Sequence, residues 1–130
     1  MPGPPYLFVY GTLRRGLENQ FSSLLAANAE FVDEARMPGR MYDFGWHPVA
    51  VPSGEPDEWV HGEVFRLNDA GSSILETLDR YEGPEFGRVS ALVTCAAGPE
   101  LKAWVYVYQG TRTGHRILSG NWLAKRSLLP

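Results

Sequence analysis

The stretch Tyr6-Leu7-Phe8-Val9-Tyr10 is the part of the sequence that decides the fold. Its side chains are all apolar or aromatic, which is typical of a central strand that is buried on both faces. The segment Gly11-Thr12-Leu13-Arg14-Arg15-Gly16 then ends the run. From about Glu18 to Ala29 the spacing of apolar side chains indicates a helix that is only loosely amphipathic. The chain therefore opens with a buried strand, a glycine loop and a helix.

Strand patterns dominate the sequence downstream of this unit. The segments that we expect to be extended are Glu30–Tyr42, Trp59–Leu67, Phe86–Cys95 and Leu101–Gln109. The last two are alternating runs joined by a short turn, so they predict a β-hairpin. A second helix is predicted from an N-cap at Asn68 and Asp69 to about Tyr81 or Glu82, where Gly83-Pro84 ends it.

Two segments are expected to lack regular structure. Gly45–Asp57 contains Pro48, Pro52 and Pro56 and is predicted to be a loop, and Gly110–Pro130 is predicted to form short turns and a tail. No linker divides the chain, so residues 1–130 are expected to form a single domain. Helices that are far apart in the sequence, among many strands, predict an α+β fold: a small mixed β-sheet or barrel with helices packed on it.

Composition and charge exclude several classes of function. The chain has 130 residues, of which 44% are hydrophobic and 21% charged, an ordinary globular composition. A net charge of −3 without a long run of Lys or Arg argues against a nucleic-acid partner. One cysteine excludes an internal disulfide, and three histidines without ligand spacing argue against a metal site. The absence of a recognisable signal peptide or membrane-spanning run predicts a cytoplasmic protein. We also expect a monomer or weak homodimer.

The glycine loop after the first strand has the chemistry of an anion site. Glycine lets a ligand approach the backbone closely, and the following helix directs its positive end at an anion. The spacing Gly-x4-Gly is that of a P-loop, but Leu17 stands where a P-loop needs Lys, so nucleotide binding is excluded. A carboxylate fits such a loop better than a polyphosphate does. The alternative is a tight turn that binds nothing.

Glu82 is the carboxylate that the pattern places on an apolar surface. On a helical wheel with Ile74 at zero, Leu78 falls near about 40° and Glu82 near about 80°, within the apolar face. A carboxylate in such a place loses its hydrating water, and the usual result is a raised pKa. A pKa closer to neutral pH allows the group to accept and donate protons in catalysis. The alternative is a frayed last turn in which Glu82 reaches water or pairs with Arg88. Glu85 is a weaker candidate because Pro84 removes it from the helix.

Other side chains are candidates of lower specificity. Tyr106 and Tyr108 share one face of a strand, and such tyrosines either close a pocket or pack at the edge of the core. Arg88 is placed to neutralise a carboxylate of the protein or of a substrate, or to lie at the surface. Cys95 is predicted to be a small core residue.

Two of these motifs together resemble a known family. Tyr10-Gly11-Thr12-Leu13-Arg14-Arg15-Gly16 after an apolar strand, followed far downstream by Leu78-Asp79-Arg80-Tyr81-Glu82-Gly83, resembles the γ-glutamylcyclotransferase-like family in its γ-glutamylamine-cyclotransferase and AIG2-like branch. The strand Trp104–Gln109 and the segment Ser119–Leu123 also look like small bacterial members. The resemblance covers nearly the whole chain and implies a small mixed barrel. One departure is Phe86-Gly87-Arg88, where the family often has Tyr-x-Arg.

The resemblance implies an enzyme that needs no cofactor. In the family the substrate's α-amine attacks its own γ-carbonyl, which closes 5-oxoproline and releases an amine or amino acid. Carried over to this chain, Glu82 is the general acid/base, and the loop that holds the γ-glutamyl end is Tyr10, Gly11, Thr12 and Leu13. Arg88 and Tyr108 are expected as further contacts of the γ-glutamyl substrate.

Two other functions stay open from the sequence. A binding protein of the same fold would hold a carboxylated small molecule without turnover, although such a protein gains nothing from an acid facing its ligand. An interaction protein is supported only by the aromatic strand Trp104–Tyr108. The leaving group is not determined either, and the segment Trp46–Trp59 is our candidate for the wall that selects it.

Overall fold

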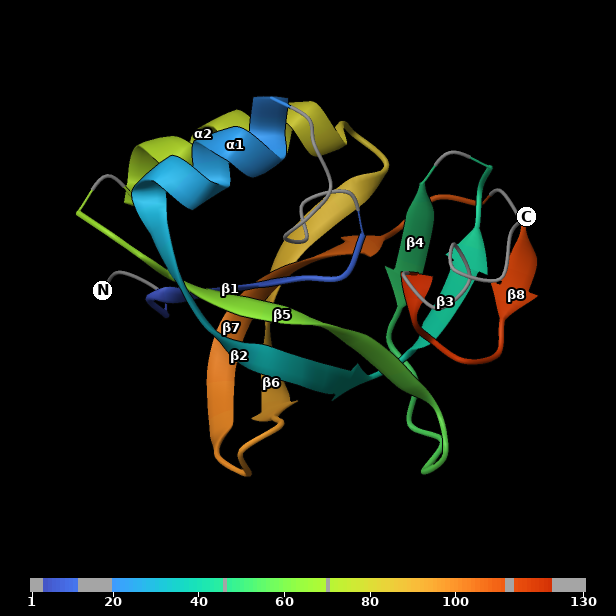
Figure 1. Ribbon diagram of the computed structural model, residues 1–130. Helices are drawn as coiled ribbons and strands as arrows, with labels where there is room; N and C mark the ends of the chain where they lie inside the picture. The colour runs from blue at the N-terminus through green and yellow to red at the C-terminus, as the bar shows by residue number, and fades with distance from the viewer. Residues whose placement is uncertain (1–3, 12–19, 46, 70, 112–113, 123–130) are drawn as a thin grey trace, which may run out of the picture.

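A closed barrel of strands organises the protein (Figure 1). The order around the barrel is β1 (Tyr6–Val9), β5 (Trp59–Leu67), β2 (Ala29–Pro38), β6 (Phe86–Cys95) and β7 (Glu100–Tyr108). Neighbouring strands are antiparallel, except that β7 meets β1 in parallel with Trp104 opposite Leu7. The computed structural model describes residues 4–11, 20–45, 47–69, 71–111 and 114–122. The predicted mixed α+β barrel is confirmed.

Strand β1 is buried on both faces, as its apolar run predicts. Phe8 packs in one cluster with Val64 and Val105 of the neighbouring barrel strands. Leu7 and Val9 face the other way and pack against side chains of the helices. A strand between two apolar layers needs no polar face, which is why the alternation of a half-exposed strand is missing here.

Two helices cover one side of the barrel and lie next to each other (Figure 1). Helix α1 spans Gln20–Asn28, and residues 18 and 19 of the predicted helix lie outside the described residues. Helix α2 spans Gly71–Glu82 and begins just after the predicted caps, where the Gly71 N–H donates to the Asn68 carbonyl at 2.9 Å. Its apolar face of Ile74, Leu75 and Leu78 is buried, as the helical wheel predicts. Among the described residues no helix is both long and apolar enough to cross a membrane.

A second, three-stranded sheet contradicts two predictions of irregular structure. It joins β4 (Pro48–Val51), β3 (Arg40–Asp43) and β8 (His115–Ile117) in that order. Strand β4 lies inside Gly45–Asp57, and β8 lies inside Gly110–Pro130, so both predictions of irregular structure were wrong there. Pro48 is tolerated because it begins its strand, opposite Asp43, and Val49 and Ala50 are fully buried. Such short strands exist through their neighbours, which local patterns cannot supply.

Candidate functional site

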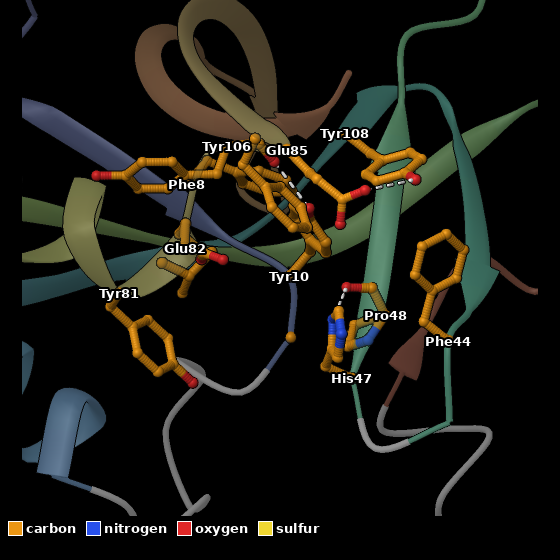
Figure 2. Close-up of a pocket in the computed structure, with 13 residues that line it drawn as sticks. Phe8, Tyr10, Phe44, His47, Pro48, Tyr81, Glu82, Glu85, Tyr106 and Tyr108 are labelled. Carbon is orange, nitrogen blue, oxygen red and sulfur yellow. Dashed lines mark hydrogen bonds between the residues drawn. The ribbon is translucent and has the colours of Figure 1, made fainter. Parts of the chain in front are cut away.

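A pocket of about 190 Å³ opens where the barrel meets the second sheet and the end of α2. Segments that are far apart in the sequence line it, and these are Phe8–Gly11, Phe44, His47, Pro48, Tyr81, Glu82, Glu85, Phe86, Tyr106 and Tyr108. Figure 2 shows Glu82 on one side of this pocket, with Tyr108, His47 and Phe44 on the other and Tyr10 between them. The predicted site residues Tyr10, Gly11, Glu82 and Tyr108 therefore meet in one cavity.

Glu82 is the last residue of α2 and projects into the pocket (Figure 2). Gly83 follows it with a φ of 86°, a left-handed conformation that ends a helix at little cost when the residue is glycine. Burial raises the pKa of the Glu82 carboxyl from 4.5 to about 7, with no cation among the described residues to offset it. At neutral pH this group is poised to accept or to release a proton.

Tyr10 fixes the end of β1 beside that carboxyl. Its hydroxyl donates to the Tyr106 carbonyl at 2.7 Å and accepts from the Ala50 N–H at 3.2 Å. Burial, and then the nearby charge of Glu82, raise the pKa of Tyr10 far above its ordinary value, so this hydroxyl stays neutral. The Tyr10 hydroxyl thus links the barrel to β4 by hydrogen bonds, and the residue lies between the two ends of the pocket.

Gly11 brings the glycine loop into direct contact with the second sheet. A Cβ on Gly11 would lie 2.7 Å from Cγ of Pro48, closer than real Cβ contacts allow. Only glycine permits this approach, so Gly11 and Pro48 together form part of the pocket wall. The predicted contacts of Thr12 and Leu13 lie outside the described residues.

Arg88 does not belong to the pocket lining. Its guanidinium binds Asp79 in a fork, with Nε 2.8 Å from Oδ1 and Nη2 3.2 Å from Oδ2, and it stacks 4.5 Å over the Trp104 ring. The Tyr106 hydroxyl also donates to Asp79, at 2.6 Å. Burial acts to raise the pKa of Asp79, but these bonds outweigh it and hold that pKa below its usual value. Arg88 therefore attaches the end of α2 to β6 and β7, and the carboxylate that it neutralises belongs to the protein.

The structure adds pocket residues that the sequence analysis ranked low or did not select. Glu85, ranked low because Pro84 removes it from the helix, lines the pocket and accepts from the Tyr108 hydroxyl at 3.4 Å. Its position is set by the backbone, because the Gln109 N–H donates to the Glu85 carbonyl at 2.7 Å. Phe44 and His47 also line the pocket, although nothing in their sequence context distinguishes them from loop residues. The signal that could have found Glu85 is its place directly before β6, whose first residue, Phe86, pairs with Tyr108.

Metal-ligating side chains do not gather in the part of the chain that is described. No group of three or more His, Cys, Asp or Glu residues there is arranged to hold a metal ion. Cys95 is buried, which confirms its assignment to the core. The chemistry that the described pocket offers is a carboxyl of raised pKa, tyrosine hydroxyls, backbone groups at Gly11 and aromatic rings.

Comparison with known proteins places the chain in a family. The family described as γ-glutamyl cyclotransferase, AIG2-like, matches residues 7–124. The chain is 35% identical over 119 residues to the γ-glutamylcyclotransferase family protein YtfP of Escherichia coli K12, which covers 90% of this chain and 95% of that protein. It is also 31% identical over 114 residues to γ-L-glutamyl-butirosin B γ-glutamyl cyclotransferase of Niallia circulans, over 80% of this chain and 67% of that one. The chain therefore belongs to the AIG2-like γ-glutamylcyclotransferase family.

Solved structures support the same fold. YkqA of Bacillus subtilis superimposes with a TM-score of 0.74 at 25% identity, and covers 98% of this chain with 44% of its own length. An AIG2-like protein of Mus musculus superimposes with a TM-score of 0.66 at 20% identity, over 85% of this chain and 81% of that one. The barrel with its two helices is thus the architecture of these proteins too.

Proposed function

We propose that the protein is a γ-glutamyl cyclotransferase that converts a γ-glutamyl amine or γ-glutamyl amino acid to 5-oxoproline and a free amine. The observation that carries this proposal is the Glu82 carboxyl, which faces the pocket with a pKa of about 7. Family membership supports the class of reaction, and the butirosin relative is named for removing a γ-glutamyl group. An anion-binding protein would gain nothing from a carboxyl at this place.

The reaction is an intramolecular aminolysis. The α-amine nitrogen of the γ-glutamyl group forms a bond to its own γ-carbonyl carbon, and the bond from that carbon to the leaving nitrogen breaks. Both reacting groups belong to one molecule, so the protein has only to hold the folded conformation, and no cofactor is required. The rate gain comes first from this positioning.

Glu82 serves as the general acid/base in this proposal. Its carboxylate accepts the proton that the α-amine loses on attack, and the resulting carboxyl donates that proton to the leaving nitrogen. A group whose pKa lies near the working pH is suited to both halves of this transfer, which is worth roughly 10² to 10⁴ in rate.

The glycine loop would bind the other end of the substrate. Backbone N–H groups from Gly11 to Leu13 are proposed to hold the substrate's α-carboxylate or the oxyanion that develops on the carbonyl, but not both with every donor. Tyr10 and Tyr108 complete the proposed contacts because both line the pocket. Arg88 is left out of the substrate contacts because Asp79 holds it outside the lining. The cytoplasm remains the location that we propose from the sequence.

The proposal is tested by release of 5-oxoproline from a panel of γ-glutamyl amines and γ-glutamyl amino acids. We expect turnover by the wild type and a loss of at least roughly a hundredfold in Glu82→Gln, which keeps the size of the side chain but cannot take the proton. Glu76→Gln is the matched control, since Glu76 is an exposed residue on the same helix. Turnover that survives in Glu82→Gln would refute the role of Glu82, and silence of the wild type on the whole panel would favour a binding protein.

A further inference from the structure

A network of side chains beside the pocket joins the last turn of α2 to the hairpin of β6 and β7. The Asp79 carboxylate accepts a fork of hydrogen bonds from the Arg88 guanidinium of β6, at 2.8 and 3.2 Å. It accepts a third bond from the Tyr106 hydroxyl of β7, at 2.6 Å. The same guanidinium lies 4.5 Å from the centre of the Trp104 ring, also on β7. We call these four residues the Asp79 network.

The Asp79 network is better fixed than a single ion pair at the surface. The side chains of Arg88 and Asp79 are 25% and 40% exposed, so water weakens their attraction only in part. A fork sets the orientation of both groups as well as their distance. The third partner, Tyr106, is 4% exposed and is held in place by the core. Three bonds that converge on one carboxylate therefore restrain where Asp79 lies.

The turn that carries Asp79 is also the turn that carries Glu82. The Gly83 N–H donates to the Asp79 carbonyl at 3.3 Å, and this bond encloses Glu82 in the last turn of α2. The end of a helix frays easily because its last backbone groups lack partners within the helix. Gly83, with a φ of 86°, is a flexible residue directly after Glu82. The contacts of Asp79 with β6 and β7 therefore restrain the turn from which Glu82 projects.

The basicity of Glu82 depends on this place. Burial is what raises the pKa of Glu82 to about 7, so a carboxyl that turned out into water would return toward 4.5. The hydroxyls of Tyr10 and Tyr106 donate elsewhere, to the Tyr106 carbonyl and to Asp79. The titratable side chains of the described lining around Glu82 are Tyr10 from β1, Tyr106 and Tyr108 from β7, Tyr81 from α2, Glu85 after α2 and His47 before β4.

We propose that Arg88 and Tyr106 are positioning residues, which act through Asp79 to hold the Glu82 carboxyl inside the pocket. This inference rests on the proposed function, in which Glu82 transfers the proton. Arg88 serves the reaction without a contact to the substrate. Because its guanidinium binds Asp79, almost one turn earlier on the helix, Arg88 restrains α2 and does not neutralise Glu82.

The sign of a change in the pKa of Glu82 separates positioning from a direct effect of charge. Arg88→Met removes a positive charge and leaves Asp79 without its cation, so a direct effect of charge would raise the pKa of Glu82. A loss of positioning would lower that pKa, because a loosened turn lets water reach the charged carboxylate. Tyr106→Phe removes a hydrogen bond and no charge, and positioning again predicts a lower pKa.

An NMR titration of the glutamate side-chain carboxyl carbons measures this pKa directly. The signal that is missing from Glu82→Gln identifies the carboxyl of Glu82. One partly exposed ion pair or hydrogen bond changes such an equilibrium by up to about fivefold, so we expect the midpoint to fall from about 7 by about half a unit in Arg88→Met and in Tyr106→Phe. An unchanged or raised midpoint in either variant would overturn the positioning role of that residue.

Kinetics of 5-oxoproline release provide the second measurement. Both variants should lower kcat about threefold or more and leave KM within about twofold, because they disturb the proton transfer and not the binding of the substrate. Arg40→Met is the matched control: it breaks the 2.7 Å pair of Arg40 with Glu58, on β3 and outside the pocket lining. It should leave kcat and the pKa of Glu82 at their wild-type values. Equal effects of Arg40→Met and Arg88→Met would show a general loss of stability and would overturn the proposal.

The titration also distinguishes a failure of this inference from a failure of the proposed function, because it needs no turnover. If the wild type releases 5-oxoproline from no substrate of the panel, the cyclotransferase proposal fails. A lowered midpoint in the two variants would then still support the positioning of Glu82. If the wild type turns over substrate but the midpoint does not fall in the variants, the positioning role alone is refuted.

Discussion

Replacing Glu82 by Gln should stabilise the protein in a pH-dependent way. The Glu82 carboxyl has a pKa of about 7 in the folded protein because burial removes water from its charged form, against an ordinary value of 4.5. The folded protein therefore holds this proton more tightly than the unfolded chain does. Since a Gln side chain does not titrate, the difference in unfolding free energy between the variant and the wild type isolates this one proton.

The sign and size of the effect follow from the two pKa values. Below about pH 4.5 the carboxyl is neutral in both states, and the full contribution of the neutral Glu82 to stability is present. As the pH rises toward 7 the unfolded chain releases the proton first, so the wild type loses stability. At roughly 1.4 kcal/mol per pKa unit, the shift corresponds to a loss of about 3 kcal/mol, complete above about pH 8.

Urea denaturation of wild type and Glu82→Gln at several values between about pH 4.5 and about pH 8.5 measures this difference. We expect it to grow by about 3 kcal/mol in favour of the variant over that range, while Glu76→Gln follows the wild type at every pH. A constant offset between Glu82→Gln and the wild type would show that the carboxyl is not desolvated. Glu82 would then also lack the raised pKa that proton transfer at neutral pH requires. Greater stability with lower activity is the trade-off expected of a residue retained for function.

Three further outcomes follow from the site and its support. The kcat/KM of the wild type should rise through about pH 7 as Glu82 loses its proton, and Glu82→Gln should lack this limb of the pH profile of 5-oxoproline release. Gly11→Ala should lower kcat/KM by roughly tenfold or more, because the added Cβ would lie 2.7 Å from Cγ of Pro48 and displace the pocket wall. Activity equal to that of the wild type would contradict this contact. Arg88→Met should lower the unfolding free energy in urea by about 1 kcal/mol, since the fork to Asp79 is partly exposed, and an unchanged midpoint would show that the pair contributes nothing.

The sequence by itself determined the parts that depend on local pattern. The run Tyr6–Tyr10 predicted a strand buried on both faces, and the structure confirms it. The alternating runs of Phe86–Cys95 and Leu101–Gln109 predicted a β-hairpin, which the structure also contains. The helical wheel placed Glu82 on the same face as the apolar side chains. The helical period alone determines the direction in which each side chain projects from the helix axis, and no tertiary contact is needed. These features needed only neighbours within a few residues.

Tertiary structure alone decided how the pocket is completed. Strands β4 and β8 are too short to be recognised locally and form only because β3 lies between them. Sequence left open which carboxylate Arg88 would pair with, and the fold brings Asp79 within 2.8 Å of its guanidinium. The rings of Phe44 and His47 contact Tyr108 and Phe86, which lie far along the chain, so no local pattern could reveal these contacts. Local sequence determines on which face of a helix or strand a side chain lies. The contacts on which its function depends form between segments that are distant in the sequence, and these contacts exist only in the folded barrel.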